Sequence, residues 1–152
     1  MKVLFVGGTG IISTHCVEAA VERGWEVTLL NRGQSGPVPA GCSHIQADIH
    51  NLDQARQALG NREFDSVIDW ITFEPEQVAS SVELFRGRTG QWVFISTASA
   101  YQKPPQTVPI TEKTPLENPF WAYSRAKIAC ENMLQEEMAN GFPAPIVRPS
   151  HT

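Results

Sequence analysis

The sequence predicts an α/β fold in which a doubly wound parallel β-sheet carries helices on both faces. Short apolar runs typical of strands alternate with longer stretches of helical period along the 152-residue chain. The first strand breaks into a glycine-rich turn that opens directly into a helix. A later run, 91–96, is almost continuously apolar in its middle, as expected of a strand that is covered on both faces.

The order of the elements follows from these patterns. The first strand begins at Lys2, and further strands are expected over residues 26–30, 43–47, 64–70, 91–96 and about 144–147. Helices are expected over residues 10–23, 52–59, 76–86 and 120–140. Gly24 can end the first helix, and the Gly- and Pro-rich stretch 31–41 predicts a loop. Four prolines make 97–118 irregular, and loops of that length usually serve a function.

Composition narrows the class of protein. With 41% hydrophobic and 18% charged residues, the chain suits one globular domain with a substantial core. The net charge is −4 and the basic residues are scattered, which argues against nucleic acid or an anionic membrane as the main partner. There is no apolar run near the roughly 20 residues that span a bilayer, and the first residues form no export signal. A cytoplasmic protein is therefore expected.

The cysteines and histidines predict no metal site. An odd number of cysteines without a C-x-x-C spacing is typical of reduced thiols in the cytosol. Small buried hydrophobic side chains are the default interpretation of all three. No metal-ligand spacing joins Cys16, Cys42, Cys130, His15, His44 and His50.

The turn after the first strand predicts a phosphate site. Its glycines lack Cβ atoms, so the main chain can turn sharply and a pyrophosphate can approach the backbone. N–H groups at the start of the next helix favour an anion there. The alternative is a tight turn without a ligand. The residues expected to bind a nucleotide cofactor are Gly7, Gly8, Thr9, Gly10, Ile11 and Ile12.

The second and third strands end in residues suited to the adenosine half of a dinucleotide. A ribose with a free 2′-hydroxyl favours an acidic residue after the second strand, but the sequence has Asn31 and Arg32. An arginine there suits a 2′-phosphate, so NADP is favoured over NAD; the alternative is a solvated loop charge. Asp48 can accept a hydrogen bond from the adenine amino group, with Ile49 covering the ring. Alternatively, Asp48 only caps the following helix.

The fifth strand and the last helix carry a candidate catalytic set. Thr97 lies at the carboxyl end of that strand, and Tyr123 and Lys127 are one helical turn apart. A neighbouring ammonium lowers the pKa of a tyrosine and makes it a better base, so we expect Lys127 to act in this way on Tyr123. Lys127 can also hold the ribose of a nicotinamide nucleotide while Thr97 holds the substrate oxygen. The alternative is a tyrosine at the core edge beside a solvated lysine.

Together these elements resemble the short-chain dehydrogenase/reductase superfamily, in its extended branch, the NAD-dependent epimerase/dehydratase family. The resemblance covers the whole chain and depends on residues 6–13, 46–49, 94–101, 119–127 and 146–149. It implies a Rossmann-type NAD(P)-binding domain, with Thr97 as the catalytic hydroxyl, Tyr123 as the base and Lys127 as its partner. It also implies Asp48 at the adenine.

The same resemblance implies more about the whole protein. Substrates of the family are often nucleotide sugars held by a C-terminal domain. We therefore expect residues 1–152 to be an NAD(P)-binding domain truncated before a substrate-binding region, and inactive as an isolated fragment. Subunits of the family commonly pair through the helices expected here near 76–86 and 120–139. From the residues themselves, Trp121 is expected to be a packing residue, with an edge of the substrate site as the alternative. His151, just beyond the last strand, is expected to have no special role, with an approach to the nicotinamide as the alternative.

Two departures from the family pattern qualify the substrate class. Ser13 replaces the last glycine of the loop, which predicts a helix slightly further from the strand, and Tyr101 is followed by Gln102-Lys103-Pro104 where many members have glycine. These features are similar to an atypical branch that includes the chloroplast stem-loop-binding proteins. The alternative function is a non-catalytic nucleotide-binding or regulatory module, possibly RNA-associated, on the same fold; the acidic charge weighs against RNA.

Overall fold

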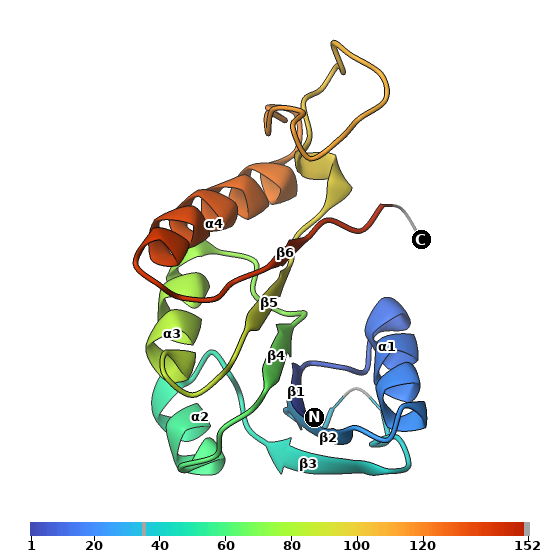
Figure 1. Ribbon diagram of the computed structural model, residues 1–152, viewed down its shortest axis with the longest axis vertical. Coiled ribbons are helices and arrows are strands. Elements are labelled where there is room, and N and C mark those ends of the chain that lie inside the picture. Colours follow the sequence, from blue (N-terminus) through green and yellow to red (C-terminus); the bar gives the residue numbers. More distant parts are fainter. Residues whose placement is uncertain (35, 151–152) are drawn as a thin grey trace.

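The chain folds into one six-stranded sheet between two helical layers (Figure 1). The computed structural model describes residues 1–34 and 36–150. All adjacent strands are parallel, in the order β3-β2-β1-β4-β5-β6. The direction of winding reverses between β1 and β4, where such sheets bind ligands. The strands are β1 Lys2–Val6, β2 Glu26–Asn31, β3 Cys42–Gln46, β4 Ser66–Asp69, β5 Trp92–Ile95 and β6 Ile146–Val147.

Helices cover both faces of the sheet, as predicted. They are α1 Ile11–Glu22, α2 Leu52–Leu59, α3 Pro75–Phe85 and α4 Ala122–Ala139. Figure 1 shows α1 on one face and α2, α3 and α4 on the other. Right-handed crossovers explain this, because the β1–α1–β2 step moves along the sheet in the opposite direction to the later steps. The predicted fold class is therefore confirmed.

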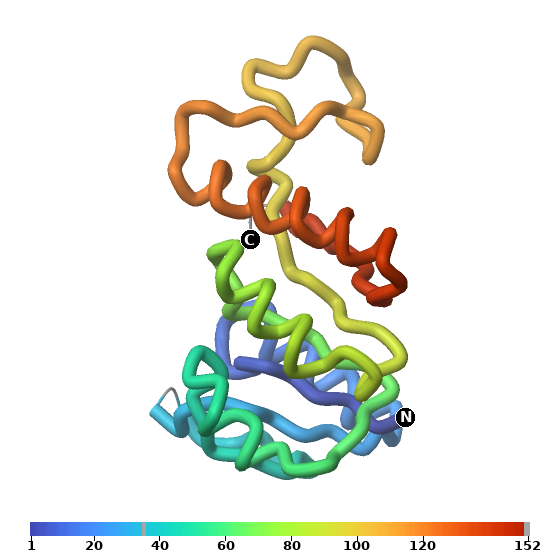
Figure 2. The backbone as a smooth tube through the Cα atoms, turned by 90° about the vertical axis from the view of Figure 1, so that its left-hand side faces the viewer, coloured from blue at the N-terminus to red at the C-terminus, as the bar shows by residue number. Residues whose placement is uncertain are grey.

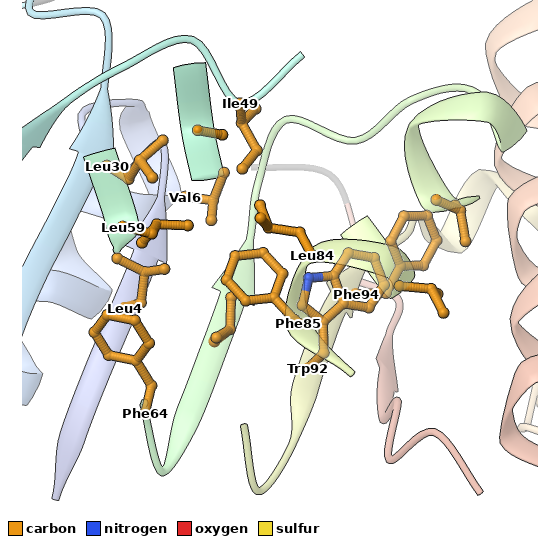
Figure 3. Packing of buried hydrophobic residues seen from close by; sticks show 14 of the residues in the cluster. Leu4, Val6, Leu30, Ile49, Leu59, Phe64, Leu84, Phe85, Trp92 and Phe94 are labelled. Carbon is orange, nitrogen blue, oxygen red and sulfur yellow. The ribbon is translucent and has the colours of Figure 1, made fainter. Parts of the chain in front are cut away.

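Two apolar clusters lie on the two faces of the sheet. On the α2–α4 side, Leu4 and Val6 pack in the larger cluster with Trp92 and Phe94 (Figure 3). On the α1 side, the alternate residues of β1 pack against α1. Every second residue of β1 thus belongs to a different cluster, which is why the strand reads as a continuous apolar run. No helix within the described residues has both the length and the apolar character needed to cross a bilayer.

Several element boundaries differ from the sequence expectation. Helix α4 begins at Ala122 with Trp121 as its N-cap, two residues later than expected. Strand β4 is shorter than 64–70, and Phe64 forms only an isolated bridge with Thr89. The irregular segment after β5 contains one 3₁₀ turn, Ala98–Ala100, and extends beyond the carboxyl edge of the sheet (Figures 1 and 2). This segment and the start of α4 both lie at the carboxyl ends of the strands.

Candidate functional site

The glycine turn has a backbone that other residues adopt poorly. Gly7 and Gly8 have φ values of +97° and +94°. A Cβ on Gly8 would lie 2.6 Å from the Leu29 Cδ2 atom, so close packing also requires glycine there. Gly10 is the N-cap of α1. The N–H groups in the first turn of a helix have no carbonyl acceptor within that helix, so they are free to bind an anion.

Ser13 is accommodated within this turn. Its side chain is buried, and its hydroxyl accepts a hydrogen bond of 2.8 Å from the Gly10 N–H. The Gly10 N–H at the start of α1 therefore already has a hydrogen-bond acceptor in Ser13. Thr9 is half-buried, Ile12 is half-buried and Ile11 is 85% exposed. The predicted loop residues thus surround the start of α1.

A cavity of about 750 Å³ lies at the carboxyl ends of the central strands. Thr97 from the end of β5 and Tyr123 and Lys127 from α4 all line it, so the structure brings the three predicted catalytic residues together. Ile12 of α1 lines it too, which connects this cavity with the glycine turn. Its remaining wall is largely apolar and includes Trp70, Phe73, Ile95, Ile110, Trp121 and Pro149.

Thr97 begins a chain of hydroxyl groups. Its Oγ1 atom lies 2.9 Å from the Ser99 Oγ, which in turn lies 2.8 Å from the Ser124 Oγ. Asn118 donates to the Ser99 carbonyl at 2.7 Å and to the Ser124 Oγ at 3.3 Å. Ser124 and Asn118 are buried, so the chain anchors the Thr97 hydroxyl on α4. Sequence reasoning identified Thr97 but missed this support.

Tyr123 lies between two aromatic rings. Its ring centroid is 4.9 Å from that of Trp121 and 6.2 Å from that of Phe73. Burial raises the pKa of Tyr123, because desolvation disfavours the phenolate. The expected lowering by Lys127 is therefore wrong for this arrangement. The role of Tyr123 as a base stays a prediction.

Lys127 is more buried than the sequence suggested. Its side chain is 1% exposed, and its ammonium donates hydrogen bonds to the carbonyl oxygens of Thr72 at 2.6 Å and Ile95 at 2.8 Å. The rings of Phe73 and Phe94 lie with their centroids 4.6 Å from the Nζ atom. Desolvation lowers the pKa of Lys127 to about 8. The alternative of a solvated lysine is excluded.

Asp69 was missed by sequence reasoning. It ends β4 and is fully buried, and its carboxylate accepts hydrogen bonds from the backbone N–H groups of Ile71 at 3.0 Å and Thr72 at 2.9 Å. The Thr72 hydroxyl donates a further bond at 3.0 Å. Burial raises the pKa of Asp69, while these bonds and the Lys127 charge oppose the rise. An acidic residue at the end of an apolar strand was the available signal.

The predicted adenosine residues gather at a smaller cavity of about 220 Å³. Asn31, Arg32, Asp48 and Ile49 all line it. Asp48 does not cap α2, because Asn51 is the N-cap and accepts from the Gln54 N–H at 3.1 Å. The Asp48 carboxylate instead accepts from the His50 N–H at 3.0 Å. The capping interpretation of Asp48 is therefore wrong.

A buried ion pair supports the other side of the site. The Glu131 carboxylate is 0% exposed, and its two oxygens share the single Nε–H of Arg148 at 3.0 and 3.1 Å. It also accepts a bond of 2.5 Å from the Arg148 Nη2 and one from the Ser96 hydroxyl. Arg148 also donates to the Tyr101 hydroxyl at 3.1 Å. This network joins α4 to the ends of β5 and β6. Glu131, one turn after Lys127 on the same helix, was the missed signal.

The remaining candidates are less informative. Among residues 1–34 and 36–150, no three potential metal ligands lie together. His151 lies outside the described residues. Trp121 does line the larger cavity, as one interpretation expected. An open hollow of about 800 Å³ lies at the opposite edge of the sheet, near Lys2 and Gly90, and contains none of the predicted site residues.

The sheet order and the clustered threonine, tyrosine and lysine define an α/β protein of the short-chain dehydrogenase/reductase class. The model of the NAD dependent epimerase/dehydratase family matches residues 3–152. The chain belongs to that family.

Sequence relatives include several UDP-glucose 4-epimerases. A UDP-glucose 4-epimerase from Streptomyces lividans is 32% identical over 91% of this chain and 48% of its own length. A chloroplast stem-loop binding protein of 41 kDa from Arabidopsis thaliana is 25% identical over 91% of this chain and 39% of its own length. The chain thus spans about half the length of the curated relatives it matches.

Solved structures show the same fold. The UDP-Glc/GlcNAc 4-epimerase from Campylobacter jejuni matches with a TM-score of 0.81 at 22% identity, over 97% of this chain and 52% of that protein. The UDP-glucose 4-epimerase from Bifidobacterium longum in complex with NAD+ and UDP matches with a TM-score of 0.77 at 20% identity, over 97% and 52%. Both similarities extend over nearly the whole chain.

Proposed function

We propose that the chain is the dinucleotide-binding domain of an epimerase-type oxidoreductase that acts on a nucleotide sugar. The observation that carries the proposal is the single cavity lined by Thr97, Tyr123 and Lys127, which Ile12 connects to the glycine turn. The half-length match to the Streptomyces lividans epimerase supports a further, substrate-binding region in the whole protein. The isolated domain is then expected to bind cofactor without turnover.

The residues of this chain fit a nicotinamide dinucleotide. Gly7 and Gly8 allow the sharp turn of the backbone, and the first turn of α1 offers N–H groups to a pyrophosphate. Such a cofactor, when bound, accepts a hydride from a carbinol carbon and returns it. Arg32 at the smaller cavity supports NADP over NAD, because a guanidinium pairs well with a 2′-phosphate. Asp48 and Ile49 are proposed to contact the adenine.

The three candidate catalytic side chains in the larger cavity are proposed to have different roles. Thr97 holds the reacting oxygen of the sugar through its hydroxyl, which Ser99 and Ser124 orient. Tyr123 exchanges a proton with that oxygen through its phenolic group. Lys127 uses two of its three N–H donors on the Thr72 and Ile95 carbonyls, so one remains for a ribose hydroxyl or the phenol.

The test is Tyr123→Phe in a protein that includes the substrate-binding region. Turnover of UDP-glucose is expected to fall by at least about 10²-fold, because the proton-exchanging group is lost. The affinity for NADPH or NADH, measured by fluorescence titration, is expected to stay within a factor of about two, which corresponds to less than about 1 kcal/mol of binding free energy. Trp25→Phe, in the apolar cluster on the α1 side of the sheet, is the control for an aromatic substitution away from the cavity.

Three outcomes separate the candidate functions. Unchanged turnover in Tyr123→Phe would remove the proposed base. Failure of the parent to bind either nucleotide at millimolar concentration would remove the enzyme proposal. Cofactor binding without turnover on any nucleotide sugar would favour the regulatory module, which the similarity to the chloroplast stem-loop binding protein brings into consideration.

Assembly and location are part of the same proposal. The exposed faces of α3 and α4, which pack side by side, are proposed to pair with a second subunit. The cysteines Cys16, Cys42 and Cys130 form no disulfide in the described chain, and a reducing cytoplasmic location is proposed.

A further inference from the structure

The carboxamide of Asn31 is held in one orientation at the end of β2. Its oxygen accepts a hydrogen bond of 2.8 Å from the Gly33 N–H and lies 3.0 Å from the His44 Nε2. A backbone N–H can only donate, so the atom facing Gly33 must be the oxygen rather than the amide nitrogen. The usual ambiguity between the two ends of an asparagine is therefore resolved by the backbone.

The same reasoning fixes the tautomer of His44. The Asn31 oxygen is an acceptor, so the Nε2 atom that faces it must carry a proton. His44 lies on β3, where Leu29 is its register partner, and Gln46 pairs with Asn31 two residues further. The Gln46 side chain donates to the Arg32 carbonyl at 3.1 Å. Two outward side chains of β3 thus hold the Asn31–Arg32 segment.

The part of Asn31 that is left for a ligand is its NH2 group. Both lone pairs of the carboxamide oxygen are engaged, and within the described residues the Nδ2 atom has no hydrogen-bond partner. Asn31 and Arg32 line the 220 Å³ cavity together. A ribose 2′-hydroxyl is best bound by an acceptor, whereas a 2′-phosphate accepts only and is best bound by donors. This edge of the cavity therefore presents an amide donor beside a guanidinium.

We infer that His44 is a specificity-determining residue, which orients the Asn31 carboxamide so that its NH2 group and Arg32 select a dinucleotide with a 2′-phosphate. The inference rests on the proposed function of the glycine turn as a dinucleotide site. His44 does not touch the phosphate in this arrangement and acts through Asn31. Loss of His44 releases one of the two bonds that hold the carboxamide.

The experiment compares NADPH and NADH affinities of the protein and its variants by fluorescence titration. In Asn31→Asp a carboxylate replaces the amide, so NADPH should bind about tenfold or more weakly while NADH is unchanged or tighter, since charged hydrogen bonds are lost. In His44→Phe the preference for NADPH should fall by roughly threefold, the smaller loss expected of an indirect contact. His15→Phe, on α1, is the control for an exposed histidine.

The outcomes are distinguishable. NADH binding that persists in every variant shows an intact fold and dinucleotide site. Equal effects on NADPH and NADH in both variants, or a parent that prefers NADH, would overturn the inference and leave the dinucleotide site in place. A His44→Phe variant with the full preference for NADPH would overturn the role of His44. A parent that binds neither nucleotide would instead overturn the proposed function itself.

Discussion

Lys127 shows how one side chain responds to its position in the fold. Its ammonium has two carbonyl partners but is enclosed by aromatic rings, so the charged form is disfavoured and the pKa falls to about 8. A lysine with this pKa is partly neutral at physiological pH. A basic group of this kind at a cavity is typical of a functional site.

The lowered pKa of Lys127 predicts how stability depends on pH. Below pH 8 the lysine is protonated in both the folded and the unfolded chain, so it gives no slope. Between about 8 and the ordinary lysine pKa of 10.5, the unfolded chain binds more protons, so the free energy of unfolding should rise with pH. The total rise in the free energy of unfolding should approach about 3 kcal/mol, because a change of one pH unit in the pKa corresponds to about 1.4 kcal/mol.

Urea unfolding between pH 8 and 10.5 tests this prediction, with Lys127→Met as the comparison. Both proteins should carry Cys130→Ala, because the pKa of Cys130 is raised to about 11 and its titration lowers stability in an overlapping range. The Lys127 protein should gain stability relative to the Met variant as the pH rises. Parallel curves would show that Lys127 has an ordinary pKa.

Helix α4 is the element that organises the site. It presents Tyr123 and Lys127 to the cavity and Glu131 to the ends of β5 and β6. These residues follow at intervals of four, so they share one face of the helix. Their sequence spacing predicted that the first two would be together. It gave no partner for Glu131, because Ser96 and Arg148 come from other elements.

Removal of the Glu131 carboxylate should destabilise the fold strongly. Glu131→Ala leaves Arg148, whose side chain is 16% exposed, without its ion-pair partner, and should cost about 3–5 kcal/mol in thermal or urea unfolding. The control is Glu83→Ala, which breaks an exposed pair with Arg56 and should change stability by less than about 1 kcal/mol. Similar losses in the two variants would contradict a structural role for the buried pair.

The arrangement of the helical layers determines how whole molecules could pair. Helices α3 and α4 lie side by side on the same face of the sheet (Figure 2). The small residues Ala79 on α3 and Ala129 on α4 are exposed. A small side chain lets a second helix approach closely. A long cation at either position would instead separate the two surfaces.

Ala129→Arg should therefore convert a dimer into a monomer, as judged by sedimentation equilibrium at micromolar concentration. Glu18→Arg adds a cation to the exposed surface of α1, on the other face, and should leave the dimer intact. A parent protein that is monomeric across this concentration range, or a dimer unaffected by Ala129→Arg, would remove the pairing proposal.

The sequence by itself determined the features that depend on neighbours along the chain. Hydrophobic period gave the order and type of the elements, and φ values near +95° at Gly7 and Gly8 agree with the turn predicted from their lack of a Cβ atom. The i,i+4 spacing placed Tyr123 and Lys127 on one face of α4. Boundaries were less accurate, as at Phe64 and Trp121, because packing decides where a strand or helix ends.

Only the tertiary structure decided which residues contact one another across the sheet and which side chains are shielded from water. The burial of Lys127 and Asp69, the pairing of Glu131 with Arg148 and the hold of His44 on Asn31 all join segments that are far apart in sequence. Desolvation and the direction of a hydrogen bond depend on every neighbouring atom. No pattern along a single strand or helix contains that information.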